Sequence, residues 1–169
     1  MDAIGVLTES FSRVPLLARR AVEGLTAEQL AWAPAEGANP IAWLVWHLAR
    51  GQDAQIAQVA GTDQVYASGS WAPRFGLPSD ADDTGYGHDE EDVRAVCPES
   101  AQTLLDYLAA VHEATLVYLG TLEAADLDLV VDEAWDPPVT LGVRLVSIVD
   151  DAVQHIAQAA YVLGMPLRD

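Results

Sequence analysis

A carboxylate and an imidazole lie one helical turn apart near the C-terminus, in the stretch SIVDDAVQHIAQAAYVLG. Its apolar residues recur at the spacing of a buried helix face, and Asp151 and His155 fall on that face. Burying either group alone is costly, so each needs a partner. Three partners are conceivable: an Asp–His hydrogen bond, an arginine from another helix, or a divalent metal ion that both residues bind.

A third ligand from another helix would favour the metal. His47, in WLVWHLARG, lies at the edge of an apolar stripe, with small residues one turn away that leave room beside its ring. His112 lies near the inner face of a further helical stretch, and His88 lies in a loop; each alone is an ordinary core or surface histidine. Two histidines and one carboxylate form a set that leaves metal positions open for water or substrate.

Three neighbouring side chains are candidates for binding a cofactor or substrate. Trp43 is expected to line a pocket, with plain core packing as the alternative. Arg50, one turn after His47, is suited to meet a substrate carboxylate, or else to pair with one of the 26 acidic residues. Gln158, one turn beyond His155, is placed to orient a ligand or bound water, or it is a polar residue at a helix contact. No catalytic acid, base or nucleophile is identified.

Four long stretches have the apolar spacing of a helix, at about 2–23, 40–60, 98–122 and 141–163. Asn39 and Thr140 are the expected N-caps of the second and fourth, and Pro166 follows the end of the last. A short helix is expected after Thr26. The pattern predicts an all-α, four-helix bundle that forms a single domain over residues 1–169.

The irregular segment between the second and third long helices, residues 62–96, is rich in Gly, Pro and Asp but also contains Trp71, Phe75 and Tyr86. Such a long loop is unusual in a compact domain unless it has a function. We expect an ordered crossover that covers one end of a pocket, with one helical turn near residues 90–96.

The composition excludes several partners. The formal net charge is −18, and all eight basic residues are arginine, so neither nucleic acid nor an anionic membrane is an expected partner. The single cysteine, Cys97, cannot form an internal disulfide, which favours a reducing cytoplasm. The N-terminus lacks the pattern of a signal peptide, and no apolar run approaches the roughly 20 residues of a membrane span.

Two segments carry a family resemblance. The segments NPIAWLVWHLAR and VDEAWDPPVTLGVRLVSIVDDAVQHIAQAAYVLG resemble the second-helix and C-terminal motifs of the DinB/YfiT-like metal-binding four-helix bundles, and the likeness covers nearly the whole chain. Within that family the sequence is similar to the mycothiol-dependent, thiol-transferase branch. The resemblance implies His47, Asp151 and His155 as ligands of a divalent metal, zinc or nickel. Many relatives have His or Glu at the position of Asp151.

The resemblance favours a metal-dependent enzyme that uses a low-molecular-weight thiol such as mycothiol to transfer or isomerise a small electrophilic substrate. Two alternatives remain open. One is a non-catalytic bundle whose polar trio is a structural network or an inert metal site, serving as a binding or stress module. The other is a hydrolase that activates a metal-bound water. Bundles of this kind often pair through helix faces, so a homodimer is a further expectation.

Overall fold

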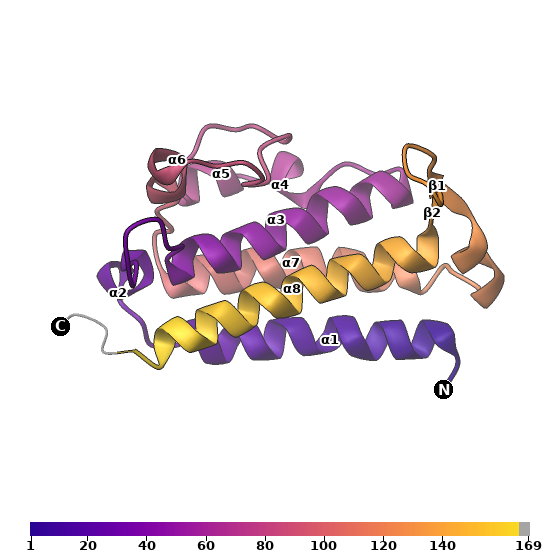
Figure 1. Cartoon of the computed structure of the whole chain (residues 1–169), viewed down its shortest axis with the longest axis horizontal. Helices are drawn as coiled ribbons and strands as arrows, with labels where there is room; N and C mark the ends of the chain where they lie inside the picture. The colour runs from indigo at the N-terminus through magenta and orange to yellow at the C-terminus, as the bar shows by residue number, and fades with distance from the viewer. Residues whose placement is uncertain (166–169) are drawn as a thin grey trace.

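The computed structural model describes residues 1–165, and four long helices form a bundle: α1 (Ala3–Val22), α3 (Ile41–Ala60), α7 (Ala101–Leu119) and α8 (Leu141–Leu163). Helix α8 packs on α1 and α3, and α7 packs on the same two helices from the other side (Figure 1). The predicted all-α four-helix bundle is therefore confirmed. Helix α3 makes its most extensive contacts with α8 and α7.

The starts of the long helices follow from their capping residues. The side chains of Asp2, Ser100 and Thr140 accept hydrogen bonds from backbone N–H groups in the first turns of α1, α7 and α8. Thr140 was the predicted cap of α8. The predicted cap of α3 is wrong by one residue: Pro40, not Asn39, occupies that position, with extended backbone and no side-chain cap.

The crossover between α3 and α7 is ordered and contains three short helices, α4 (Val65–Ser68), α5 (Trp71–Arg74) and α6 (Glu90–Ala95). It lies along α3 in Figure 1 and returns the chain to the end of the bundle where α3 begins, so α3 and α7 run in the same direction. Helix α6 is the predicted turn near residues 90–96. Helices α4 and α5 have only four residues each, too few to show a helical period.

The remaining short elements lie at the two ends of the bundle. Helix α2 (Ala27–Ala31) follows Thr26, whose side chain caps it as predicted. The connection to α8 contains a 3₁₀ turn, residues 124–128, and a small antiparallel hairpin of β1 (Val130–Asp132) and β2 (Val139–Thr140). Sequence pattern does not predict this hairpin, because strands of two or three residues are too short to show an alternation of apolar and polar residues.

The core is apolar along the inner faces of all four long helices, and Pro15 lies within α1 without interrupting it. Helix α8 ends at Leu163; Pro166, expected to follow that end, lies outside the described residues. Within residues 1–165, none of the helices combines the length and the apolar character that crossing a membrane requires.

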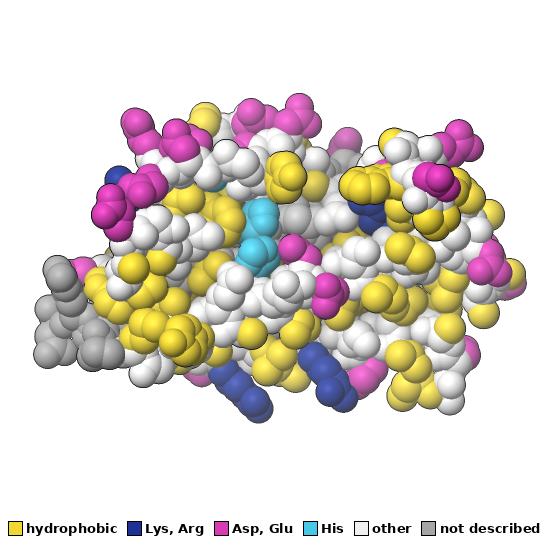
Figure 2. Space-filling model, in the orientation of Figure 1, with side chains coloured by type: hydrophobic (Ala, Val, Ile, Leu, Met, Phe, Trp, Pro, Cys, Tyr) yellow, Lys and Arg dark blue, Asp and Glu magenta, His cyan; other side chains and the backbone are white. Residues whose placement is uncertain are grey.

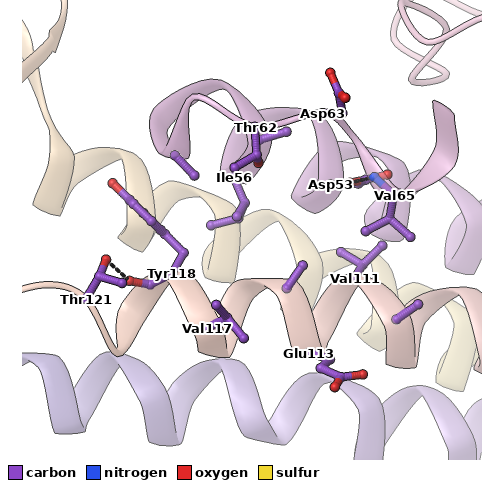
Figure 3. A pocket seen from close by; sticks show the side chains of 14 residues that line it. Asp53, Ile56, Thr62, Asp63, Val65, Val111, Glu113, Val117, Tyr118 and Thr121 are labelled. Carbon is purple, nitrogen blue, oxygen red and sulfur yellow. Dashed lines mark hydrogen bonds between the residues drawn. The ribbon is translucent and has the colours of Figure 1, made fainter. Parts of the chain in front are cut away.

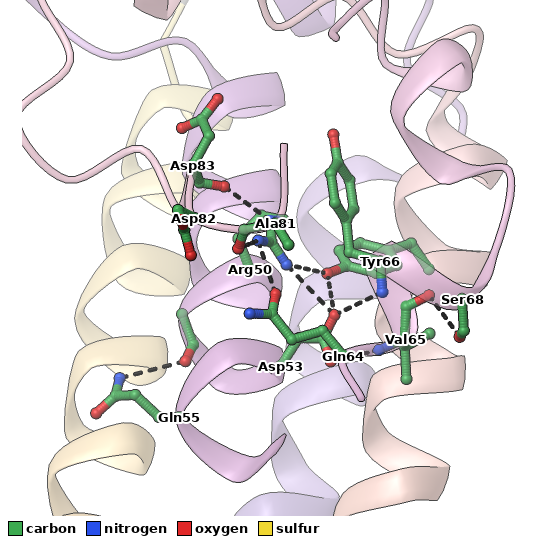
Figure 4. A network of polar contacts seen from close by, with 12 residues as sticks. Arg50, Asp53, Gln55, Gln64, Val65, Tyr66, Ser68, Ala81, Asp82 and Asp83 are labelled. Carbon is green, nitrogen blue, oxygen red and sulfur yellow. Dashed lines mark hydrogen bonds and ion pairs between the residues drawn. The ribbon is translucent and has the colours of Figure 1, made fainter. Parts of the chain in front are cut away.

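One charged side chain lies in the centre of this structure. Arg50 is fully buried, and each of its five N–H groups has a hydrogen-bond acceptor (Figure 4). Its guanidinium also lies 4.1 Å from the centre of the Tyr66 ring. The acceptors come from α3, from α7 and from the crossover, so the cluster holds these segments together; they are Asp53, Tyr107, Gln64 and the backbone carbonyls of Ala81 and Asp83.

The Arg50 cluster predicts a large loss of stability when its carboxylate is removed. Asp53 accepts from Arg50, from Tyr107 and from two backbone N–H groups of α4. The substitution Asp53→Ala leaves a buried guanidinium unpaired and should lower the free energy of unfolding by about 3 kcal/mol in chemical denaturation. Glu9→Ala, which breaks an exposed ion pair with Arg13, should cost about 0.5 kcal/mol or less. Equal losses would contradict a central role for the cluster.

Candidate metal centre

The structure brings together three side chains from two helices. His47 of α3 and Asp151 and His155 of α8 each offer one ligand atom, and these atoms lie within 4.8 Å of one another. Helices α3 and α8 run antiparallel, which places a residue early in α3 opposite residues late in α8. In Figure 2 histidine side chains reach the surface in the middle of the face turned toward the viewer, at the wall of a recess and beside an acidic side chain.

The crossover fixes the orientation of the His47 ring. His47 Nδ1 hydrogen-bonds the backbone carbonyl of Thr84, so Nδ1 carries the proton and Nε2 keeps its lone pair. Gly85 allows this close approach: it has a φ of +88°, and a Cβ there would lie 2.8 Å from His47 Nδ1. A carbonyl that holds the outer nitrogen of a histidine is the usual support of a metal-binding imidazole.

His155 is held in a similar way from its own helix. Its Nδ1 lies 3.2 Å from Gln158 Oε1 and donates to it. Its Nε2 lies 3.4 Å from Asp151 Oδ1. In both histidines, therefore, Nδ1 hydrogen-bonds to an oxygen, and Nε2 is the nitrogen that can bind a metal ion.

The pKa values of the three groups respond to this geometry. The hydrogen bond to His155 lowers the pKa of Asp151, and the hydrogen bond to Asp151 raises the pKa of His155. Burial lowers the pKa of His47. The geometry therefore favours the neutral form of His47 and the protonated form of His155 beside the Asp151 carboxylate.

Aromatic rings enclose the cluster on the inner side. Trp43 stacks on His47, with ring centres 4.5 Å apart, and presents its edge to His155. Trp43 Nε1 donates to His88 Nδ1, and His88 Nε2 lies 2.8 Å from Asp83 Oδ1. Trp43 is thus both core and a wall of the site, and the loop histidine His88 positions it.

The structure places the other candidates away from the cluster. Arg50 has no N–H group left for a substrate carboxylate, and the alternative considered for it, an ion pair with an acidic residue, is present with Asp53. His112 lies on α7, outside the cluster, where burial lowers its pKa. Cys97 is exposed at the start of the segment before α7.

A cleft of about 270 Å³ opens beside the cluster, lined by His47, Gly51, Ala54, Gln55, Thr84, Tyr86 and Asp151. Thr84 and Gly85 belong to the site but are not among the residues that the sequence predicts for it. Their contribution depends on the hydrogen bond between His47 and Thr84, which are 37 residues apart in the chain. The only local indication in the sequence is Gly85, the first glycine in DDTGYG. Tyr86 is 94 % exposed at this cleft.

The donor set fits a divalent metal ion. Two imidazole nitrogens and one carboxylate are ligands that zinc and nickel accept, and three protein ligands leave coordination positions for water or substrate. Asp151 is 46 % exposed, and both His47 and Asp151 line the cleft, so the site is reachable from solvent.

A larger cavity, of about 660 Å³, lies between α3 and α7 (Figure 3). Its wall is mainly apolar, including Ile56, Val65, Val111 and Val117, and none of the three clustered residues lines it. The carboxylate of Asp53 at its edge is already bonded to Arg50 and Tyr107. Size alone therefore does not make this cavity the reactive site.

The contact between Gly85 and His47 predicts the effect of adding one methyl group. Gly85→Ala should lower zinc affinity about tenfold in competition titrations, because the added Cβ displaces His47 or the Thr84 carbonyl. Gly87→Ala is the matched control: Gly87 also has a positive φ, of +81°, but no described atom lies within 4 Å of its added Cβ. Equal zinc affinities in the two variants would contradict this account of the His47 support.

The pKa directions predict how many protons a metal displaces. At pH 6.5 His155 is more than half protonated, because its pKa is raised, whereas His47 is less than half protonated, because its pKa is lowered. Zinc binding at pH 6.5 should therefore release close to one proton, and fewer as the pH rises above the pKa of His155. Calorimetry in buffers of different ionisation enthalpy measures this number. Release of two protons, or a release that grows with pH, would exclude these protonation states.

Comparisons with known proteins agree with this architecture. A crystal structure described as the conserved protein of a locus from Enterococcus faecalis superposes with a TM-score of 0.88, at 34% sequence identity over 96% of each chain. No match to a curated protein was found. The profile of the DinB superfamily matches residues 10–159. With that match covering most of its length, the chain belongs to the DinB superfamily.

Proposed function

We propose that the protein is a divalent-metal-dependent enzyme that uses a low-molecular-weight thiol, such as mycothiol, to transfer or isomerise a small electrophilic substrate. The observation that carries the proposal is the position of the His47, Asp151 and His155 ligand atoms at the wall of an open cleft. A structural polar trio would be closed and dry. Here, instead, Asp151 is about half exposed.

The chain's own residues prepare the site for this chemistry. Thr84 and Gln158 hold the Nδ1 atoms of the two histidines, so neither ring has to reorient when its Nε2 binds. Trp43 covers the inner side of His47 and limits access to the cleft side. A zinc or nickel ion bound by these residues would stabilise a thiolate over a thiol, and the thiolate is the nucleophilic form.

The overall charge supports a cationic cofactor. With a formal net charge of −18, the protein attracts a divalent cation to Asp151 and repels anions in general. The proposal also includes a reducing cytoplasm, where a free thiol cofactor persists and where the lone Cys97 stays reduced. A single domain and a homodimer complete the proposed description.

The metal content of purified protein tests the first half of the proposal. Wild-type protein purified without added metal should contain about one transition-metal ion per chain by mass spectrometry. His155→Ala should lose it, because one imidazole ligand is removed. His112→Ala should keep it, since His112 lies outside the cluster. A wild type that is empty and takes up neither zinc nor nickel on titration would refute the metal site.

Thiol dependence tests the second half and separates the alternatives. The metal-loaded protein should consume a small electrophile only when a thiol such as mycothiol is present. Turnover of esters or amides without thiol would favour the hydrolase that activates a bound water. A metal that is bound but never exchanges ligands with solvent or thiol would favour the non-catalytic binding module.

A further inference from the structure

The cleft of about 270 Å³, here called the α3–α8 cleft, is lined by residues of α3, by Asp151 of α8 and by the crossover. His47 and Asp151 lie at one end of its lining, and Gln55, two turns further along α3, lies at the other. Because the two helices are antiparallel, the α8 residue opposite Gln55 precedes Asp151. That residue is Arg144: its Nη1 lies 3.1 Å from Gln55 Oε1 and donates to it.

Arg144 differs from Arg50 in what its guanidinium has left to offer. Apart from Gln55, its acceptor is Asp132 of β1, which takes one hydrogen bond from Nη2 at 2.9 Å. These bonds occupy two of the five N–H groups, and the other three make no hydrogen bond within residues 1–165. The side chain is 19 % exposed, so it is partly buried but reachable.

Next to the clustered ligands, the lining of the cleft on α3 consists of small residues. Gly51 and Ala54 line the cleft on α3, and a Cβ added to Gly51 would meet only Asp151 Oδ2, at 3.8 Å. Arg144 precedes Asp151 by two helical turns, a rise of about 10 Å. Between Gly51 and Arg144 lies the Gln55 side chain, whose Nε2 donates to the Gly51 carbonyl and whose Oε1 accepts from Arg144. A molecule that spans from the ligand cluster to the guanidinium therefore passes over Gln55.

The charge of the protein makes this position selective. A chain with a formal net charge of −18 disfavours an anion at most of its surface. Among the arginines in the part of the chain that the structure describes, Arg144 is the one that hydrogen-bonds to a residue lining this cleft. Its planar fork of donors matches a carboxylate, and a charge-assisted hydrogen bond is stronger than a neutral one.

We propose that the α3–α8 cleft binds an elongated small molecule that carries a carboxylate, with Arg144 binding the carboxylate about two helical turns from Asp151. The reactive end of the molecule then lies at His47 and Asp151. This inference rests on the proposed function, because the other end of the ligand is held by the metal site. It assigns to Arg144 the role that the sequence analysis expected of Arg50.

Thiols of graded length test the inference on cobalt-loaded protein. The probes are ω-mercapto carboxylic acids of increasing chain length and the ω-mercapto alcohols of the same lengths, and the readout is the visible absorption that thiolate binding gives to cobalt. Acids long enough to reach Arg144 should bind about tenfold more tightly than the matched alcohols. Mercaptoacetate, which is too short, should show no such preference.

Three variants isolate the guanidinium. Arg144→Gln should abolish the preference for acids while the alcohols bind as before. Asp132→Asn should increase the preference, because it removes the carboxylate that competes for Nη2. A purely structural ion pair between β1 and α8 would instead make both variants weaken acids and alcohols alike. Arg13→Gln, which removes an exposed charge from α1, is the control and should leave both series unchanged.

A failure of the Arg144 inference can be distinguished from a failure of the proposed function. If alcohols and acids bind equally at every length, or if Arg144→Gln weakens both series to the same degree, Arg144 is not an anion anchor and the inference is wrong, although the thiol site stands. If no thiol changes the cobalt spectrum, the proposed function itself fails and the inference falls with it.

Discussion

The geometry of the site depends on one buried guanidinium. Arg50 donates to the carbonyls of Ala81 and Asp83, and these bonds hold the crossover against α3. The next residue, Thr84, supplies the carbonyl that orients His47, so an interaction in the core determines which imidazole nitrogen faces the cluster. Because breaking a buried charge network is costly, this support is rigid as well as specific.

The same crossover segment serves a second side chain of the site. Asp83 uses one carboxylate oxygen to accept from the backbone N–H of Gly85 and to contact His88 Nε2. His88 in turn accepts from Trp43, which stacks on His47. The long irregular segment is therefore a structural part of the site. Its Gly and Asp residues provide the turns and acceptors that a regular helix could not place there.

The sequence was sufficient for those parts of the structure that depend on local pattern. Apolar periodicity predicted the four long helices, and the spacing of Asp151 and His155 placed both on one helix face. Arg50 was harder to place: one turn after His47 it has the spacing of a site residue, yet it points into the core. Only the packing of α7 and the crossover around α3, which no local pattern encodes, decides between these orientations.

The Asp151–His155 pair explains how a helix can direct two polar groups toward its packed face. His155 Nε2 lies 3.4 Å from Asp151 Oδ1, and Gln158 satisfies the other imidazole nitrogen, so each of these polar groups has a partner within the folded chain. A divalent cation held by Asp151 and His155 would take the place of the proton on His155. The Asp151 carboxylate is at the same time accessible through the α3–α8 cleft, as the proposed metal-dependent chemistry requires.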